Sequence, residues 1–284
     1  RPFGQLPAAP AQACRAVIAL DRELVQRFTP SPQRPALVAL LSIEKEALDT
    51  LRPGLEHAVS HAKLGWWTEE LERLVVDEPR HPAAATLRRA ARERRRSAPD
   101  LRALAEHASE ALACLAFVDR AELDTHVRLW SSSVFRELAV SCAAQIEAPV
   151  APAERFAERA GPLIREVELL FNFEVHAWAG RVYTPIEPEQ ASLWTAQPMA
   201  HAQRLQLNER LTHLEVQLDA AVADIPTEAR AALSSAIVWA RLAQRTARLA
   251  RRTASLRGEL GRTEPLRRTI RAWQVAVRAL QGAA

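Results

Sequence analysis

Two histidines of this sequence have a spacing that could bind a metal ion. His57 and His61 are four residues apart, which would place both rings on one face of a helix, as zinc ligands can be. No third ligand is recognisable near them, so we interpret them as a surface or helix-start pair. The three cysteines, Cys14, Cys114 and Cys142, are widely spaced and form no CxxC motif. This spacing argues against a disulfide framework or a zinc site and indicates a reducing compartment.

Arginine side chains gather in two stretches that could contact an anionic partner. The first holds six arginines from Arg88 to Arg96 but no aromatic residue that could stack on a base, so we expect a solvated helix end and no nucleic-acid binding. The second, residues 239–284, holds 11 arginines against two glutamates. Four of them lie at i, i+4, i+7 and i+11 on one helix face: Arg241, Arg245, Arg248 and Arg252. This face is predicted either to be solvated or to dock onto an anionic membrane surface or an acidic partner protein.

The elements that must position these residues are all predicted to be helices. The 284 residues contain only 8 glycines and are rich in alanine, leucine and arginine, which favour helix. Prolines separate stretches with a helical apolar period, near residues 12–28, 34–51, 58–77, 83–97, 99–117, 120–146, 153–178, 200–222, 227–256 and 264–281. No strand alternation, hairpin turn or Gly-rich phosphate loop is present, so we expect an all-α fold in a single domain, residues 1–284.

Neither a membrane span nor a signal peptide is recognisable. No apolar run approaches the roughly 18 residues that a spanning helix needs. The first residues, "RPFGQLPAAP", lack the apolar core of a signal peptide. We therefore expect a cytoplasmic protein, with a peripheral membrane contact as the alternative.

Two adjacent tryptophans stand out in a chain that is only 5% aromatic. Trp67 lies at helical spacing with Leu64, Leu71 and Leu74, which predicts a buried stripe. Trp66 is about 100° further round the helix, so the pair is expected to reach two neighbouring elements.

The sequence around these tryptophans resembles the squalene/phytoene synthase family. "AKLGWWTEELERL" and then "EPRHPAA" are similar to the family's KL-x-WW-x-E-E-L and P-R-HP. Three further segments are similar in the same order: "PQRPALVALLSIEKEALDTL", "AGRVYTP" and "PLRRTIRAWQVAVRAL". The resemblance covers most of residues 14–280. It implies a single helical bundle around a central cavity, in which the tryptophans are mainly structural.

The resemblance also implies a chemistry. Members of the family join two prenyl diphosphates head to head, and Mg²⁺ neutralises the pyrophosphate that leaves. Mg²⁺ prefers carboxylate oxygens. The family supplies them from two Asp-rich motifs on facing helices, each with carboxylates at i and i+4, on one helix face.

The second Asp-rich motif has lost both aspartates in this sequence. The family's N-x-x-R-D-x-x-E-D corresponds to a segment within "ELLFNFEVHAWAG", where the aspartates fall on Asn172 and His176. The motif's arginine falls on Phe171 and its glutamate on Val175, and only Glu174, on a different face, keeps a charge. Neither asparagine nor histidine offers an anionic oxygen to Mg²⁺.

The first Asp-rich motif keeps one carboxylate. The family's D-D-x-x-D corresponds best to "LDTLR", in which Asp49 remains and Arg52 carries the opposite charge. An alternative register would use Glu44, Glu46 and Asp49. Between the two motifs, the family's E-x-Y-x(5)-G-x-x-G corresponds to "ELDTHVRLWSSSVFREL".

Two positions of this intervening helix differ from the family in a way that bears on the substrate. The tyrosine falls on His126 and the second glycine on Phe135. A glycine would leave room for a prenyl chain, and a phenylalanine is expected to fill that room.

Two residues beside the diphosphate site of active members remain, Arg181 and Tyr183 of the "GRVY" segment. Because the neighbouring aspartates are missing, we expect them to serve structure. Arg181 is predicted to pair with an internal carboxylate or to cap carbonyl oxygens, and Tyr183 to be packed with its hydroxyl hydrogen-bonded.

Three functions are compatible with this pattern. The first is a catalytically degenerate family member that acts as a binding or assembly protein, with no catalytic residue, metal or cofactor. The second is an active, Mg²⁺-dependent prenyl transferase with an unusual metal site. The third is an isoprenoid or lipid binder. The number of carboxylates around the cavity separates the second from the others, and the volume of the cavity separates the third from the first.

Overall fold

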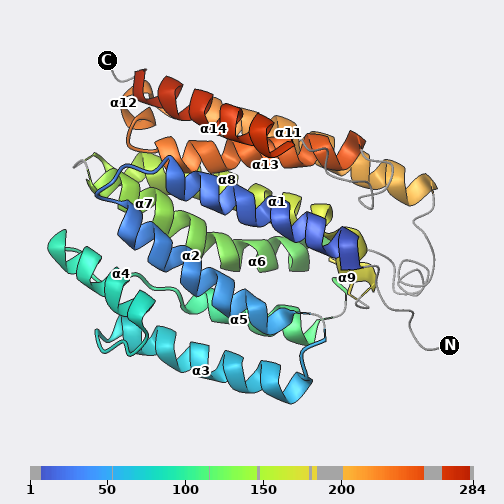
Figure 1. The fold of residues 1–284 in the computed structure, drawn as a ribbon, viewed down its shortest axis with the longest axis horizontal. Helices are drawn as coiled ribbons and strands as arrows, with labels where there is room; N and C mark the ends of the chain where they lie inside the picture. The colour runs from blue at the N-terminus through green and yellow to red at the C-terminus, as the bar shows by residue number, and fades with distance from the viewer. Residues whose placement is uncertain are drawn as a thin grey trace.

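The computed structural model describes residues 8–52, 54–114, 116–145, 148–178, 181–183, 201–252 and 264–281. It confirms the all-α fold (Figure 1). The helices are α1 (Ala8–Arg27), α2 (Arg34–Leu48), α3 (His57–Val75), α4 (Pro82–Glu93), α5 (Arg102–Ala113), α6 (Arg120–Trp130), α7 (Arg136–Gln145), α8 (Val150–Phe171), α9 (Phe173–Trp178), α11 (His201–Ala223), α12 (Thr227–Arg230), α13 (Ser234–Arg252) and α14 (Glu264–Gln281). In these ranges no residue lies in a β-strand; Ala116 and Val182 form an isolated bridge.

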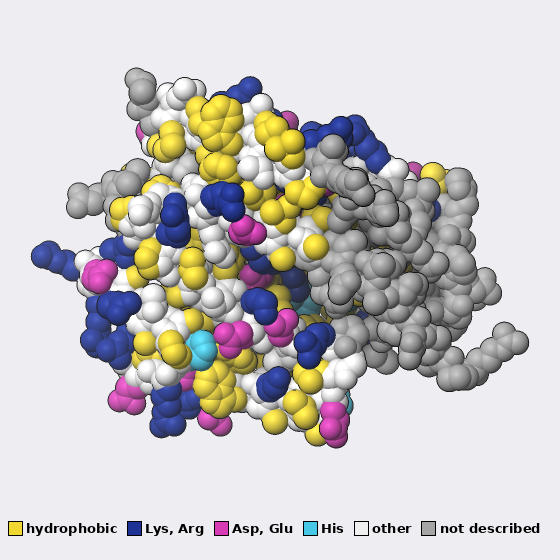
Figure 2. All heavy atoms as spheres, in the orientation of Figure 1, with side chains coloured by type: hydrophobic (Ala, Val, Ile, Leu, Met, Phe, Trp, Pro, Cys, Tyr) yellow, Lys and Arg dark blue, Asp and Glu magenta, His cyan; other side chains and the backbone are white. Residues whose placement is uncertain are grey.

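Helix α8 lies in the middle of the bundle and packs against α6, α7, α11 and α13. Helices α11, α13 and α14 form one side of the molecule, and α3 and α4 form the opposite side (Figure 1). One continuous cluster of buried apolar side chains extends from α1 to α14. Figure 2 shows the outer surface in the same view, with hydrophobic side chains gathered over α14 at the top.

The predicted helix 120–146 contains a π-helical turn, Ser131–Phe135, between α6 and α7. The backbone N–H of Arg136 donates to the carbonyl of Ser131, five residues earlier. Helix α8 approaches this turn closely at Gly161, where an added Cβ would lie 1.9 Å from Ser131 Oγ. A glycine is therefore needed for α8 to pack against the turn.

The predicted helix 153–178 is divided at Asn172. The Nδ2 of Asn172 donates to the carbonyl oxygen of Glu168, 3.0 Å away, so the side chain competes with the backbone for a helical hydrogen bond. Helix α8 ends at Phe171 and α9 begins at Phe173. The predicted helix 227–256 is likewise divided, into α12 and α13, and its last residues lie outside the described part of the chain.

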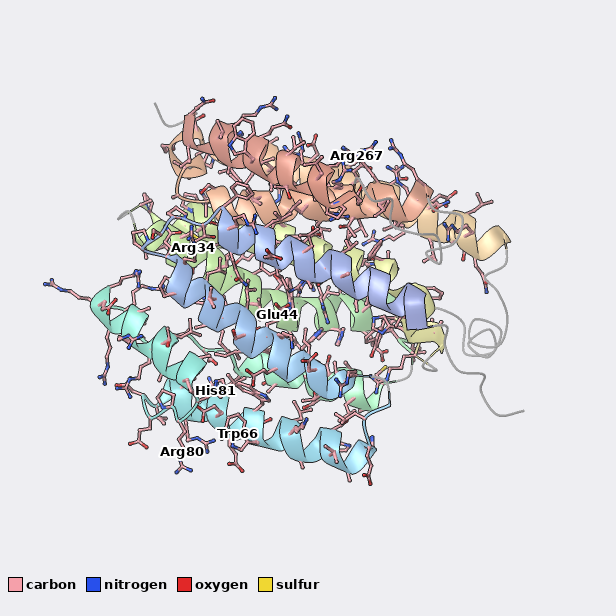
Figure 3. The ribbon with its side chains drawn as sticks, viewed as in Figure 1. Arg34, Glu44, Trp66, Arg80, His81 and Arg267 are labelled. Carbon is pink, nitrogen blue, oxygen red and sulfur yellow. The ribbon has the colours of Figure 1, made fainter. Side chains whose placement is uncertain are left out.

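The stripe predicted from Trp67 is confirmed, but the prediction for Trp66 is wrong. Leu64, Trp67, Leu71 and Leu74 are all buried on α3. The Trp66 side chain is 42% exposed and packs edge-on against Trp67 and His81, with ring centroids 5.0 and 5.9 Å away (Figure 3). The second ring thus covers the end of the α3–α4 connection at the surface, beside His81.

Three of the four arginines predicted to form a docking face are paired within the bundle. Arg241 pairs with Asp219 and Arg248 with Glu215, both on α11, and Arg245 pairs with Glu264 at the start of α14. The fourth, Arg252, is exposed. These pairs join α13 to its neighbours, and docking through this face stays a prediction.

His57 and His61 lie exposed in the first turns of α3, with their Nε2 atoms 2.8 Å apart. Among the described residues, no group of three or more His, Cys, Asp or Glu side chains could hold a metal ion. Within the same residues, no helix combines the length and the apolar character needed to cross a membrane.

Candidate functional site

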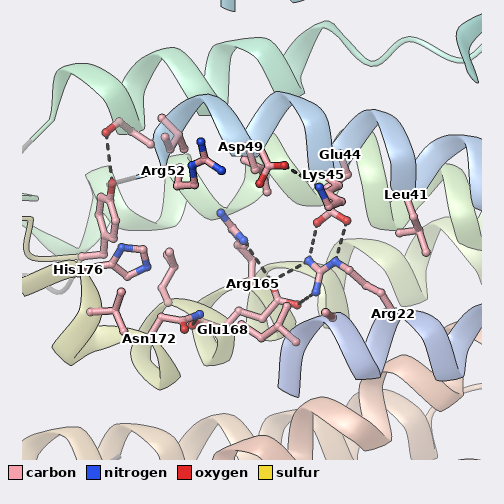
Figure 4. Close-up of a pocket in the computed structure, with 18 of the residues that line it drawn as sticks. Arg22, Leu41, Glu44, Lys45, Asp49, Arg52, Arg165, Glu168, Asn172 and His176 are labelled. Carbon is pink, nitrogen blue, oxygen red and sulfur yellow. Dashed lines mark hydrogen bonds and ion pairs between the residues drawn. The ribbon is translucent and has the colours of Figure 1, made fainter. Parts of the chain in front are cut away.

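A cavity of about 590 Å³ opens between α1, α2 and the C-terminal part of α8 with α9 (Figure 4). Its volume lies in the range of ordinary small-ligand sites. Seven of the eight site positions predicted from the sequence line it: Asp49, Arg52, His126, Asn172, His176, Arg181 and Tyr183. These residues are up to 134 positions apart in the chain (Asp49 to Tyr183), and the fold brings them around one space.

The eighth position, Phe135, is fully buried in the core. Its ring packs against Phe156 and Trp239, with centroids 5.8 and 5.7 Å away, and Trp239 in turn packs edge-on against Trp130. These four rings, which we call the aromatic plug, fill the core beside the cavity, and Phe135 itself is not among the cavity residues.

An ion network centred on Arg22 separates the cavity from the aromatic plug. The Arg22 Nε atom lies 2.8 Å from Glu44 Oε2, and Arg22 Nη1 lies 2.9 Å from Glu168 Oε1. Glu44 comes from α2 and Glu168 from α8, so one guanidinium from α1 bridges two carboxylates on facing helices (Figure 4). Its Cζ atom lies 5.1 Å from the centroid of the Trp239 ring, and Trp130 Nε1 donates to Glu44 over 2.8 Å.

Both carboxylates of this network are neutralised inside the protein. Burial alone would raise the pKa of Glu44, but the charge of Arg22 and the hydrogen bonds from Arg22 and Trp130 outweigh it and hold the pKa below its usual value. Glu168 also accepts a hydrogen bond from Arg165 Nη1 over 3.1 Å. Arg22 and Arg165 thus both form ion pairs within this network, with the buried carboxylates Glu44 and Glu168.

Three neutral histidines stand beside the network. His107 Nδ1 donates to the carbonyl of His126 over 2.9 Å, so its Nε2 accepts from Arg165, 3.0 Å away. The His107 and His126 rings stack with centroids 3.9 Å apart. Burial first, and then the charge of Arg165, lowers the pKa of His126 to about 3; burial, Arg165 and Arg181 do the same for His176. Neither residue therefore brings a charge to the cavity near neutral pH.

At the first Asp-rich motif, the one remaining carboxylate is engaged in an ion pair and a second position carries a positive charge. Asp49 accepts a hydrogen bond from Lys45 Nζ over 2.7 Å in an exposed i, i+4 pair. Arg52 is exposed at the cavity wall, near His176 and Asn172 at the end opposite Arg22 (Figure 4). Glu174, the residue that keeps a charge in the second motif, has a side chain outside the described part of the structure.

Tyr183 is packed in the interior, whereas Arg181 lies at the wall of the cavity. The Tyr183 ring is buried against His176, with centroids 4.7 Å apart, and its hydroxyl donates to the carbonyl of Ala111 over 3.2 Å, as predicted. The predicted pairing of Arg181 with an internal carboxylate or with carbonyl oxygens stays a prediction, since no such partner occurs among the described residues and residues 184–200 lie outside them. Arg181 Nη1 donates to the Tyr183 hydroxyl over 3.4 Å, and the residue lines the cavity.

The family model for squalene/phytoene synthases matches residues 21–275. This chain belongs to the squalene/phytoene synthase family. A solved structure with a similar fold is that of the squalene synthase HpnC from Alicyclobacillus acidocaldarius, with a TM-score of 0.54 and 14% sequence identity over 98% of each chain. No curated protein matches the chain by sequence.

The cavity of this squalene/phytoene synthase family member does not fit the Mg²⁺ that the family implies. The three carboxylates of the alternative register lie apart. Glu44 is held by Arg22, Asp49 by Lys45, and Glu46 points toward His81, whose Nε2 is 3.6 Å away. At the second motif, the Asn172 amide nitrogen donates to the Glu168 carbonyl, which leaves Asn172 Oδ1 as a single neutral oxygen, and His176 is neutral. Mg²⁺ sites need several free oxygen ligands, which these residues do not provide.

The sequence analysis missed the central cation of this site. Glu168 could have been found, because it precedes Asn172 by four residues and His176 by eight, on the same helical face. Arg22 gave no comparable signal, since its partner Glu168 is 146 residues away.

Proposed function

We propose that this member of the squalene/phytoene synthase family is catalytically degenerate and acts as a binding protein for a compact amphiphile with an anionic head. The observation that supports loss of catalysis is the Arg22 bridge. A fixed guanidinium engages Glu44, a carboxylate of the alternative first-motif register, and Glu168, one helical turn before the second-motif position Asn172, so neither carboxylate is free for Mg²⁺.

An anionic head group fits the charges that remain. Arg22 and Arg165 are engaged by buried carboxylates, whereas Arg52 and Arg181 line the cavity without a carboxylate partner among the described residues. Two guanidiniums without a carboxylate partner in the described part of the chain, beside neutral His176, favour a phosphate or carboxylate, because charge-assisted hydrogen bonds are strong.

A short apolar chain fits the walls of the cavity. Apolar side chains from α1, α2, the 3-10 turn Asp49–Leu51, α8 and α9 line it: Ile18, Leu41, Leu48, Leu51, Leu169 and Val175. The aromatic plug and the Arg22 network close the space beyond them, so we infer that long prenyl chains are excluded. Of the functions considered, an isoprenoid or lipid binder is favoured over a purely structural assembly protein, because an open cavity persists.

We also propose that residues 1–284 act as one cytoplasmic domain. The continuous core cluster from α1 to α14 supports a single folding unit. A partner protein recognised through the arginine face of α13 is compatible with this role, and Arg252 is the residue of that face most free to make such a contact.

The purified protein should form no product from farnesyl or geranylgeranyl diphosphate in the presence of Mg²⁺. Product analysis by mass spectrometry, with an active family member as positive control, measures this directly. A prenyl product that disappears when Asp49 or Glu46 is replaced by alanine would contradict the proposal.

Arg181→Ala should weaken binding of geranyl phosphate, measured calorimetrically in the presence of EDTA, by about tenfold or more, since a hydrogen bond to a charged group is lost. The melting temperature should hardly change, because the Arg181 guanidinium holds no described carboxylate. Arg128→Ala, an exposed position outside the cavity, is the matched control. Equal affinity of wild type and Arg181→Ala, or binding that requires Mg²⁺, would exclude a metal-free anion site.

A further inference from the structure

The outward face of α14 carries a continuous apolar stripe. Its members follow the helical spacing i, i+4, i+7, i+11 and i+14: Leu266, Ile270, Trp273, Val277 and Leu280. Four of these side chains are strongly exposed, Leu266 by 61%, Ile270 by 45%, Trp273 by 56% and Leu280 by 53%. The stripe is about 21 Å long at the helical rise. Single exposed apolar residues are normal, but an aligned row of this length marks an interaction surface.

The packing of α14 does not require this stripe. The opposite face of the helix, with Ala272, Val275, Ala276 and Ala279, is buried and holds α14 against α13 and α1. Buried Arg268 fixes the helix further through Asp21 of α1, with Nη1 2.6 Å from Oδ1. Among the described residues, these contacts hold α14 in the bundle without using the stripe.

A strip of basic side chains runs beside the apolar stripe. Arg267, Arg271 and Arg278 lie together along one flank of α14, and none has a carboxylate partner among the described residues (Figure 3 labels Arg267). Burial lowers the pKa of Arg271, and so do the neighbouring charges of Arg241, Arg248, Arg278 and Arg245. Several arginines from α13 and α14 therefore share one region of surface, despite the ion pairs that α13 makes.

We propose that α14 is a membrane-interface helix, which lays its apolar stripe into the headgroup region of an anionic phospholipid bilayer. Helix α14 forms an outer edge of the molecule (Figures 1 and 2), and such a ridge can sink into a lipid surface. A tryptophan and leucines on one face, with arginines of a single sign alongside, match the composition of helices that bind anionic interfaces. This surface is separate from the cavity, so the proposal does not depend on the ligand.

Vesicle flotation tests the proposal. Wild type should float with vesicles of phosphatidylcholine and phosphatidylglycerol, hardly with phosphatidylcholine alone, and less as the salt concentration rises. Trp273→Gln should weaken binding to the anionic vesicles by about fivefold or more, and the double variant Arg267→Glu/Arg278→Glu by about tenfold or more. Brominated lipids should quench part of the tryptophan fluorescence of wild type, and less of it in Trp273→Gln.

Matched controls distinguish binding through the α14 surface from non-specific adsorption to vesicles. Trp66→Gln removes another exposed tryptophan, and Arg128→Glu/Arg155→Glu makes the same change in net charge on α6 and α8. Both control variants should float like wild type. Absence of binding to anionic vesicles, or equal losses in the α14 variants and the controls, would overturn the proposal. So would a stable dimer that Trp273→Gln dissociates in a protein that binds no vesicles, because a second copy would then cover the stripe.

Discussion

Arg22→Ala should lower the free energy of unfolding by about 3–5 kcal/mol at neutral pH, because it leaves two buried carboxylates without their shared cation. Glu44 and Glu168 have side chains only 1% and 7% exposed, and Glu44 loses its ion-pair partner, whereas Glu168 keeps Arg165. The change is measured by urea denaturation, with the midpoint and slope fitted separately.

Two further variants show whether charge is the cause. Arg27→Ala, on the same helix, removes an arginine from the exposed pair with Glu23 and should change the stability little. Adding Glu44→Gln to Arg22→Ala should restore a substantial part of the loss, since Glu44 then carries no charge and Glu168 keeps its ion pair with Arg165. A loss in Arg22→Ala no larger than that in Arg27→Ala, or no recovery in the double variant, would show that Arg22 does not hold this site together.

Stability should fall steeply as the pH drops below about 6.5, the usual pKa of histidine in an unfolded chain. The folded-state pKa of His126 and His176 is lowered to about 3, so only the unfolded chain binds protons there between these two values. His107 adds a third such site, because burial also holds its folded-state pKa well below the usual value. The free energy of unfolding is therefore highest above about pH 6.5 and decreases by about 4 kcal/mol per pH unit once all three sites titrate in the unfolded state. Below the usual pKa of glutamate, protonation of Glu44 adds to the loss, because its folded-state pKa is also lowered.

The contribution of one histidine can be isolated from the slope of stability against pH. His126→Gln should reduce that slope by about 1.4 kcal/mol per pH unit, whatever its effect on stability at neutral pH. His213→Gln replaces an exposed histidine of α11 and should leave the slope unchanged. If His126→Gln and wild type lose stability in parallel, His126 is protonated in the folded protein and the assignment is incorrect.

Local patterns predicted the helices and seven of the residues that line the cavity. The positions of Asn172 and His176 follow from a motif whose spacing is fixed by one helical face, so the sequence is enough to place them together. Asp49, Arg52 and Tyr183 came from similar short motifs, and the bundle brings them to the same cavity.

What the sequence could not predict depends on contacts between distant elements. Nothing near Arg22 indicates that it bridges Glu44 and Glu168, because the pairing is set by how α1 crosses α2 and α8. The partial exposure of Trp66 was missed for the same reason, since it depends on how α3 packs against elements distant in the sequence.

The π-helical turn Ser131–Phe135 sets the angular phase of the long α6–α7 segment. In a uniform α-helix, residues nine positions apart such as His126 and Phe135 would point about 180° away from each other. Because a π-helical turn absorbs one additional residue, the angle falls to about 80°, and both rings can face the interior.

Losing one serine from this turn would therefore convert it to regular helix without rotating α6 against α7, at the cost of a small axial shift. The same deletion elsewhere in either helix would turn one half by about 100° and expose its apolar face. Within the α6–α7 segment, the π-helical turn is thus the place where one residue can be lost while the buried and exposed faces of both helices keep their orientation.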